Sequence, residues 1–512
     1  MMQPPRIIYF LLATLLVLLF SCQDYDFVYL PTLRITLDHA EGLDRLNADK
    51  QHHEKGCYVM TDAVGDTLAT GRLQIHGRGH STWEKPKRPY NIKLEETASL
   101  LLAKPKRRYT LLANYSDPTS LRNLLVLETA SLLMPDNPRC RLVELVLDGQ
   151  QRGLYLLTEG KRKVKDHSLA FCVLDVACCQ EVYDEAAMGF ISSQGECVAL
   201  ETPDMLSENQ LSILKARFDE MERAVASSDG RNPETGRHYT EYIDLQSFAL
   251  YYIIEEVYLN QDAGMGSFYV TWQTTEENER FVAGPAWDFD LAVGRLENPQ
   301  HMQRPDVFYA RTPIVNYGSK DWDGLLCELW QHADFREEVQ LLYTQKVAPL
   351  VWTQFEEVRF DSLCQVVLPS TQLDCQIWHR GKSPRKAMRK MRDFMLRRLQ
   401  FLDRMWTDGE DDRLLNIRVD NGWEVSHHLA EFKLDKGDEF VPPLIDRYRA
   451  EEGFVEATPK AWFYEETDSL FTAGTPIMQS TTLRLRWTMS TTMWNQAKRY
   501  LRRVLSNLLR WD

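Results

Sequence analysis

Two aspartates flank one aromatic residue in the segment AGPAWDFDLAVG, residues 283 to 294. Asp288 and Asp290 lie among Trp, Phe and Leu, where an unpaired buried carboxylate is costly. A helix cap or an arginine partner would account for them, and so would a cation, because Mg²⁺ prefers carboxylate oxygens together with phosphate and water. A second loop, YLNQDAGMGSFYV at residues 258 to 270, presents Asp262. Aspartates from two neighbouring loops suit a metal–nucleotide site.

A basic, glycine-containing turn lies far upstream of these acids. The stretch GRLQIHGRGHSTWEKPKRPYNIKL, residues 71 to 94, sets Gly77 and Gly79 between two expected strands and follows them with Ser81. Glycines allow close backbone approach to a ligand, and consecutive turn N–H groups can bind an anion. Residues 72 to 108 carry ten Lys or Arg against three Asp or Glu. The charge fits a phosphate-bearing ligand and a solvated basic surface equally well.

The chain as a whole is acidic and long enough for more than one domain. Its 512 residues, 44% of them apolar, predict two or three domains with a full core. Lys plus Arg is 60 and Asp plus Glu is 74, a net charge of −14. This balance gives no electrostatic reason to expect nucleic-acid binding, so an anion site must be local.

The N-terminus has the pattern of an export signal. Arg6 precedes an apolar run of about 14 residues, shorter than the roughly 20 that cross a bilayer. The run ends in LLFSC, which resembles a bacterial lipobox and predicts a signal peptide at residues 1 to 21, lipidated Cys22 and a tether at residues 22 to 32. A plain secretory signal or a short buried segment is the alternative. We expect an outer-membrane lipoprotein that touches the membrane only through its lipid.

The periodicity of apolar residues predicts a sheet followed by helices. The first third reads as strands with one helix, and the chain from about Glu208 reads as mainly helical. A final helix begins at Ser383-Pro384 and runs to about Trp406, with a basic face interpreted as solvated. The expected elements are strands 33–37, 71–75 and 90–94, helix 121–133, hairpin 141–160 turning at Asp148-Gly149, helices 210–226, 245–258 and 335–355, and strands around Phe268 and Phe281.

A different kind of sequence follows TDGEDD at residues 407 to 412, the best domain boundary in the chain. Residues 413 to 487 alternate aromatic and β-branched runs with polar turns and predict a small β module. Its Trp462-Phe463-Tyr464 and closing LRLRW resemble the repeat of bacterial surface proteins of the Listeria–Bacteroides type. Residues 488 to 512 read as an amphipathic helical tail.

Five blocks together resemble a known family. They are GRGHSTWEKPKRPYNIKL, LLANYSDPTSLRNLLVLETA, LDGQQRGLYLLTEG, the Asp262 loop and WDFDLAVG, and their order and spacing are typical of the CotH family of spore-coat and secreted kinases. The resemblance covers residues 33 to 406. It implies an α+β, atypical bilobal protein-kinase-like fold, with a sheet-rich N-lobe at 33–160 and a helical C-lobe at 161–406. The implied ligands are ATP and Mg²⁺ or Mn²⁺.

The resemblance also assigns roles in the nucleotide half of the site. Lys93 matches the lysine that meets the nucleotide phosphates, with Gly77, Gly79 and Ser81 in the turn before it. Glu128 is expected to hold this lysine in place. Glu159, where the lobes would join, is expected beside the adenine, and its alternative role is that of an acid at a strand end. Each of these positions is read from the matching block of this sequence.

The catalytic half of the site is assigned in the same way. Asp262 matches the aspartate that orients and deprotonates the attacking hydroxyl. Asp288 matches the metal-binding aspartate, and Asp290 is a second candidate ligand. The chain departs from the family pattern at His80, where many members have Asn, and at Ser267, where a metal-holding Asn is expected. A serine hydroxyl is a weaker ligand than an amide carbonyl, which puts one metal position in doubt.

Two functions remain open on the sequence alone. The first is a phosphotransferase that moves the γ-phosphoryl of ATP to Ser or Thr hydroxyls of proteins at the cell envelope. The second is a surface binding or structural protein that keeps the kinase-like fold and attaches through the β module. Lys93, Asp262 and Asp288 favour the first, whereas Ser267 and an exported location, where ATP is not ordinarily maintained, favour the second.

Overall fold

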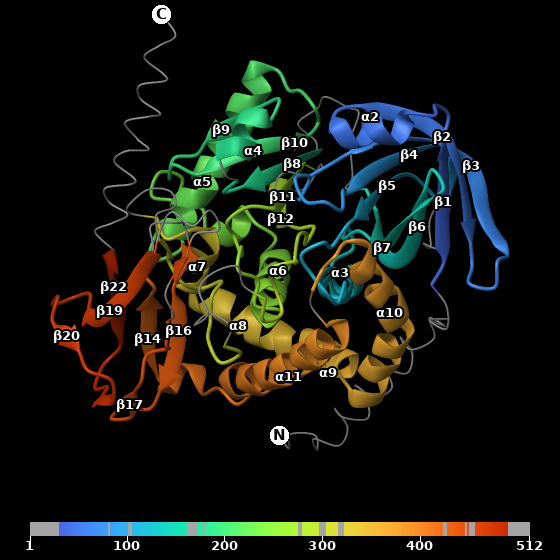
Figure 1. Ribbon diagram of the computed structural model, residues 1–512. Coiled ribbons are helices and arrows are strands. Elements are labelled where there is room, and N and C mark those ends of the chain that lie inside the picture. Colours follow the sequence, from blue (N-terminus) through green and yellow to red (C-terminus); the bar gives the residue numbers. More distant parts are fainter. Residues whose placement is uncertain are drawn as a thin grey trace, which may run out of the picture.

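The chain forms a barrel, a smaller sheet, a group of helices and a C-terminal sheet (Figure 1). The predicted signal peptide, Cys22, Ser81 and nearly all of the predicted C-terminal helix lie outside the described residues. The computed structural model describes residues 30–79, 82–100, 105–160, 171–178, 180–274, 279–295, 304–315, 322–381, 383–422, 427–445, 448–449 and 456–489.

The N-terminal region is a closed barrel in the strand order β1-β2-β3-β4-β5-β7-β6. Neighbouring strands are antiparallel except β1 and β6, whose parallel pairing closes the barrel. Alternate residues such as Leu33, Ile35, Leu73 and Ile75 point inward and are almost fully buried. A short helix, α2 (Gly42–Ala48), packs beside β2 and β3. The strands are β1 (Thr32–Leu37), β2 (His53–Thr61), β3 (Thr67–Gly77), β4 (Tyr90–Ala98), β5 (Lys106–Leu112), β6 (Cys140–Leu147) and β7 (Gln150–Glu159).

The closure of this sheet was not predicted. The sequence indicated strands here, and the kinase resemblance implied a sheet-rich lobe, but the structure has a seven-stranded barrel. The α+β class is confirmed. The predicted hairpin is also confirmed: Asp148 and Gly149 both have positive φ, 52° and 76°, which matches the tight turn that joins twisted antiparallel strands.

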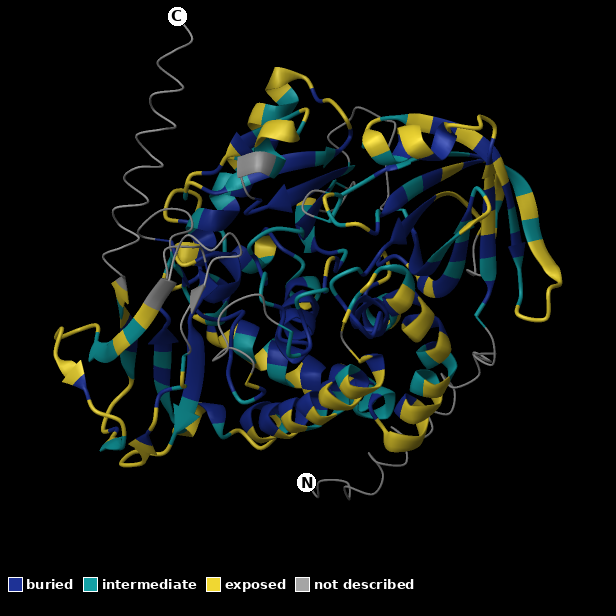
Figure 2. Ribbon diagram, viewed as in Figure 1, coloured by how far each residue is buried: buried dark blue, intermediate teal, exposed yellow. Residues whose placement is uncertain are grey.

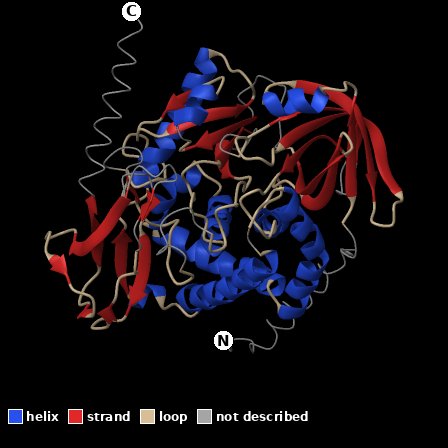
Figure 3. Ribbon diagram, viewed as in Figure 1, coloured by secondary structure: helices blue, strands red, loops and turns tan. Residues whose placement is uncertain are grey.

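A second sheet has the order β12-β11-β8-β10-β9 and lies between the barrel and the C-terminal sheet (Figures 1 and 3). It pairs β8, from the middle of the chain, with β11, which follows the Asp262 loop. A register shift interrupts the β8–β10 pairing at Glu201. Its strands are β8 (Phe171–Val176), β9 (Gly189–Ile191), β10 (Cys197–Thr202), β11 (Phe268–Thr274) and β12 (Glu279–Ala283).

The helices enclose one large apolar core that also receives residues of the second sheet (Figure 2). The predicted helix 335–355 is α8, a π-helical turn and α9 in succession, and α10 was not predicted. The helices are α3 (Arg122–Leu133), α4 (Gln180–Glu185), α5 (Glu208–Ala226), η1 (Tyr239–Glu241), α6 (Leu245–Val257), α7 (Leu325–Trp330), α8 (Ala333–Leu342), η3 (Tyr343–Val347), α9 (Ala348–Gln354), α10 (Glu357–Ile377), α11 (Pro384–Leu402), η4 (Asp403–Thr407) and η5 (Asp411–Arg413).

The C-terminal sheet begins just after the predicted boundary at 407 to 412. Ile417, Val419, Phe432 and Leu483 of this sheet belong to the same buried cluster as the helices. The β module is therefore packed against the rest of the chain. Its strands are β14 (Leu415–Asp420), β15 (His427–His428), β16 (Ala430–Leu434), β17 (Glu439–Phe440), β18 (Tyr448–Arg449), β19 (Glu456–Tyr464), β20 (Leu470–Phe471), β21 (Thr475–Pro476) and β22 (Thr481–Met489), and β13 (Ile314–Val315) pairs with β15.

A buried ion pair joins the barrel to α10. Lys87, in the β3–β4 loop, lies 2.7 Å from Asp374 on α10, and neither side chain is exposed. Asp374 also accepts a hydrogen bond from the Leu154 N–H of β7 at 3.0 Å and pairs with Arg380. Burial is the main reason that the pKa of Lys87 falls to about 8, and Asp374 opposes this fall. The charge of Lys87 therefore depends on the carboxylate.

We expect Asp374→Asn to lower the free energy of unfolding by about 3 kcal/mol, because it leaves two buried cations without their anion. Lys87→Met is the matched control: it leaves Asp374 paired with Arg380 and should cost clearly less. Urea unfolding at pH 7 measures both. Equal losses in the two variants, or a loss below about 1 kcal/mol for Asp374→Asn, would show that Asp374 is not needed to balance the buried cations between the barrel and α10.

Candidate functional site

A cavity of about 310 Å³ lies between the barrel, the second sheet and the loops that follow α6 and β12. Carboxylates dominate its charged lining, and the cations that face them come from the β3–β4 loop. The acids are Asp175 on β8, Glu201 on β10, Asp262, Asp288 and Asp290, and the cations are Arg78 and Lys85.

The loop that carries Asp262 leaves α6 in a defined conformation. Leu259 has a left-handed backbone, with φ of 49°, which turns the chain away from the helix axis. Asn260 donates to Glu255 at 2.8 Å, and its side-chain oxygen accepts the Asp262 N–H at 3.4 Å. The Asp262 carbonyl accepts the Met265 N–H at 2.9 Å. These contacts hold a half-buried carboxylate in the cavity wall.

The segment with Asp288 and Asp290 is held through its backbone. Phe289, between the two aspartates, is fully buried, and its N–H donates to Asn123 Oδ1 at 2.7 Å. The Asn123 amide in turn donates to Asn114 at 3.1 Å. Asp288 itself has a left-handed backbone, with φ of 68°. Anchoring of the central residue leaves the two flanking carboxylates at the cavity.

The same block of sequence that supplies Asn123 fixes the end of this segment. Arg122 donates from Nε to the Ala292 carbonyl at 2.9 Å and pairs with buried Asp117. Asp117 also accepts hydrogen bonds from Thr119, at 2.9 Å from its N–H and 2.7 Å from its hydroxyl. The block NYSDPTSLRN therefore acts here as a support for the acidic segment, although the sequence identified it only as part of the family pattern.

The two aspartates are electrostatically coupled. The pKa of Asp290 is raised to about 8, first by burial and then by the charge and hydrogen bond of Asp288. Arg295 opposes this rise. At neutral pH a metal-free site therefore keeps a proton on Asp290, and a bound cation would have to displace it.

The donor set fits a cation that retains ligands from solvent and substrate. Within the described part of the chain, no group of three or more His, Cys, Asp or Glu side chains is arranged to hold a metal ion. Asp288 and Asp290 offer two carboxylates that repel one another. Mg²⁺ is commonly bound by one or two carboxylates together with waters and phosphate oxygens, so this pair is a suitable protein contribution.

The predicted glycine turn reaches the cavity only in part. Gly79 lines the cavity with φ of 86°, and a Cβ there would lie 2.2 Å from the Thr82 hydroxyl. Gly77 serves packing, because a Cβ on it would lie 2.3 Å from the Trp83 ring. Ser81 lies outside the described residues.

The three other nucleotide-binding predictions fall elsewhere. Lys93 is exposed on β4, in register with Gln74 and Arg108 of the neighbouring strands. Glu128, on α3, has its pKa raised to about 7 by burial. Glu159 is buried at the end of β7. None of the three lines the cavity, and no ion pair joins Lys93 to Glu128, both of which are described.

Four charged residues of the lining received no role from the sequence. Arg78 and Lys85 belong to the basic stretch, and the resemblance passed over them in favour of Lys93. Arg78 lies over the Trp287 ring, 5.7 Å from its centroid. Asp175 and Glu201 come from strands that were not predicted, and only the pairing of β8 with β11 brings Asp175 opposite Tyr269. The irregularity at Glu201 is typical of strands beside functional sites.

Together, the fold and the site define an α+β protein whose acidic cavity lies beside a basic turn that contains glycine. Residues 75–402 match the model of the family described as CotH kinase protein. The match spans most of the chain, and the chain belongs to this family. No curated protein matches it significantly.

We expect Mn²⁺ or Mg²⁺ to release up to about one proton per site at pH 7, because the Asp290 proton must leave when metal binds. Calorimetric titration in buffers of different ionisation enthalpy measures this release. Asp290→Asn should abolish it. Glu128→Gln is the matched control, since Glu128 also has a raised pKa but lies outside the cavity. Metal binding without proton release, or equal loss in both variants, would contradict the assignment.

Proposed function

We propose that this protein is a CotH-like kinase that transfers the γ-phosphoryl group of ATP to Ser or Thr hydroxyls of exported or surface proteins. The observation that carries the proposal is the composition of one cavity. Asp262 shares it with Asp288, Asp290 and the turn at Gly79. The glycine turn precedes the three aspartates by 183 to 211 positions in the sequence, and aspartates beside such a turn suit a metal–nucleotide site.

The proposed division of roles follows from side-chain chemistry. Arg78 and Lys85 are the cations available to the nucleotide phosphates, beside Gly79. Asp288 and Asp290 would hold Mg²⁺ or Mn²⁺, which neutralises phosphate charge when bound. Asp262 orients the acceptor and takes its proton.

The proposed reaction balances without a further reactant. The acceptor hydroxyl oxygen forms a bond to the γ-phosphorus, and the bond from that phosphorus to the β,γ-bridging oxygen breaks. The hydroxyl proton passes to Asp262, and ADP leaves with the bridging oxygen. The products are ADP and a phosphoserine or phosphothreonine.

We also propose that the chain has a kinase-like, bilobal arrangement. In it, the barrel with its basic turn would correspond to the nucleotide-binding lobe, and the helices that carry the Asp262 loop would correspond to the catalytic lobe. A cavity at the junction of the two regions supports this correspondence. The closed barrel is a departure from an open sheet-rich lobe.

One observation favours the second candidate, a surface binding protein with little or no activity. Ser267 lines the cavity where a metal-holding Asn is expected, and its hydroxyl interacts with that of Tyr269. An engaged serine is a poor substitute for an amide ligand. The full set of Asp262, Asp288 and Asp290 outweighs this single replacement.

The proposed setting is the cell envelope, with a lipid on Cys22 as the only membrane contact and an envelope protein as the acceptor. The lipobox-like sequence supports it. Of the helices in the described ranges, none has the length and apolar character needed to cross a membrane.

We expect the detergent-purified full-length chain to incorporate label from γ-labelled ATP with Mn²⁺ or Mg²⁺. Asp262→Asn should lower kcat by about 10²- to 10⁴-fold, the usual contribution of a positioned acid or base. Asp288→Asn should abolish transfer, and Asp66→Asn, in an exposed barrel turn, should leave it unchanged. Absence of transfer together with no rise in melting temperature on adding nucleotide would remove the kinase proposal.

The choice of phosphate-binding cation gives a separate prediction. Lys85→Ala should raise the KM for ATP about tenfold, because a hydrogen bond to a charged group contributes about 1.5–3 kcal/mol. Lys93→Ala is the matched control and should change KM by less than about twofold, since Lys93 is exposed outside the cavity. Initial-rate kinetics at varied ATP measure both. The reverse order of effects would return the role to Lys93.

A further inference from the structure

His428 contacts the backbone of the Asp262 loop from outside the family match. The imidazole is 2% exposed, and its Nε2 lies 2.5 Å from the carbonyl oxygen of Ala263, the residue after Asp262. A carbonyl oxygen can only accept, and Nδ1 also lies near one, at 3.2 Å from the Thr312 carbonyl. We assign the single proton of the neutral ring to Nε2, which makes the shorter contact and donates to Ala263. His428 is on β15 of the C-terminal β module, which pairs with β13 in a separate two-stranded sheet, whereas the family match ends at residue 402.

The other side of the imidazole is held by the loop at 304–315. Thr312 donates from its hydroxyl to the Leu429 carbonyl at 2.9 Å and lies 3.3 Å from His428 Nδ1. The Tyr309 ring meets the imidazole edge to face. Burial lowers the pKa of His428 to about 4, so the ring is neutral at pH 7 and has one N–H to donate.

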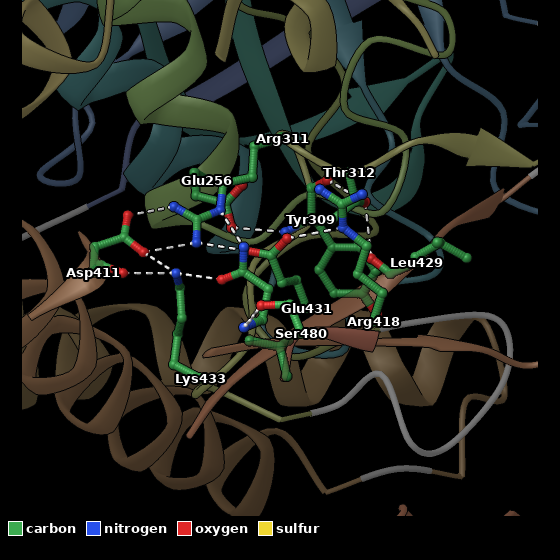
Figure 4. Close-up of polar contacts among 12 residues, drawn as sticks. Glu256, Tyr309, Arg311, Thr312, Asp411, Arg418, Leu429, Glu431, Lys433 and Ser480 are labelled. Carbon is green, nitrogen blue, oxygen red and sulfur yellow. Dashed lines mark hydrogen bonds and ion pairs between the residues drawn. The ribbon is translucent and has the colours of Figure 1, made fainter. Parts of the chain in front are cut away.

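A buried ion network fixes β16, the strand that follows His428 in the chain (Figure 4). Arg311 donates to both Asp411 oxygens, at 2.5 and 2.9 Å, and lies 2.6 Å from Glu431 of β16. Glu256, near the end of α6, accepts the N–H groups of Tyr309 and Ala310 at 2.8 and 2.6 Å. The loop at 304–315 is thus bonded to α6 on one side and to the C-terminal sheet on the other.

We propose that His428 is a positioning residue for the Asp262 loop, and that the C-terminal β module is an integral part of the site. The Ala263 carbonyl is buried in the turn that presents Asp262, and its hydrogen bond to His428 restrains the peptide that follows the aspartate. The catalytic part of this inference rests on the proposed kinase function. The inference differs from an attachment role for the β module, in which the module could be altered without effect on the loop.

Three variants of the full-length chain separate positioning from general stability. His428→Leu removes the donor, and His428→Gln keeps an amide N–H long enough to reach the position of Nε2. His427→Leu is the matched control: His427 is the neighbouring residue of β15, similarly buried, and its Nε2 lies 3.0 Å from Asp420. Melting temperature is measured for each variant.

The first readout does not require activity. Hydrogen–deuterium exchange of peptides covering residues 258 to 267 reports the order of the loop, including the Met265 N–H bonded to the Asp262 carbonyl. We expect exchange in His428→Leu to be at least about tenfold faster, while His428→Gln and His427→Leu stay within about threefold of wild type. Equal exchange in His428→Leu and His427→Leu would overturn the proposal.

The second readout is phosphoryl transfer. His428→Leu should lower kcat by about tenfold to a hundredfold, with KM for ATP within about threefold, because a small displacement of a catalytic group acts on the chemical step. His428→Gln should recover most of kcat. Equal losses in both His428 variants would contradict positioning by the donor. If wild type transfers no label, the kinase function fails, and the exchange result alone decides the role of His428.

Discussion

A charged side chain can be buried only when an opposite charge is buried with it, and this constraint determines how the regions of the protein are joined. Three fully buried cations are each paired with acids from distant parts of the chain. One pair joins the barrel to α10, one joins α11 to α6, and one joins the loop at 304–315 to the C-terminal sheet. They are Lys87 with Asp374, Arg398 with Glu256, and Arg311 with Asp411 and Glu431. Because Glu256 lies near the end of α6, its pair with Arg398 also fixes the helix that leads directly into the Asp262 loop.

Local periodicity predicted most elements that carry a strong pattern of their own. The hairpin at Asp148-Gly149 and helices α3, α5, α6 and α11 appear close to the expected residues. Closure of the barrel depends on the parallel pairing of β1 with β6, which no local pattern encodes. Helix α10 contains Pro369, a residue that normally argues against a helix interior, and its packing on β7 compensates.

The residues of the candidate site also divide into those that the sequence identified and those that it did not. Asp288 and Asp290 were found because acids among aromatic residues need an explanation, Asp262 was found from its loop and the family resemblance, and the three do share one cavity. Lys93 was assigned by resemblance alone and is exposed on the outer surface of the barrel, whereas Lys85, eight residues earlier, lines the cavity. Asp175, Glu201 and His428 could not be found from sequence, because strand pairing and the packing of the C-terminal β module bring them to the site.

We propose that Asp288 and Asp290 hold a divalent cation beside Asp262. The most direct test of this proposal is the anomalous scattering of Mn²⁺ in crystals grown with a non-hydrolysable ATP analogue. We expect a manganese peak at coordination distance from both aspartates, with the terminal phosphate facing Asp262 and the phosphates contacted by Lys85 or Arg78. A nucleotide bound elsewhere, or a manganese ion without Asp288 among its ligands, would contradict it.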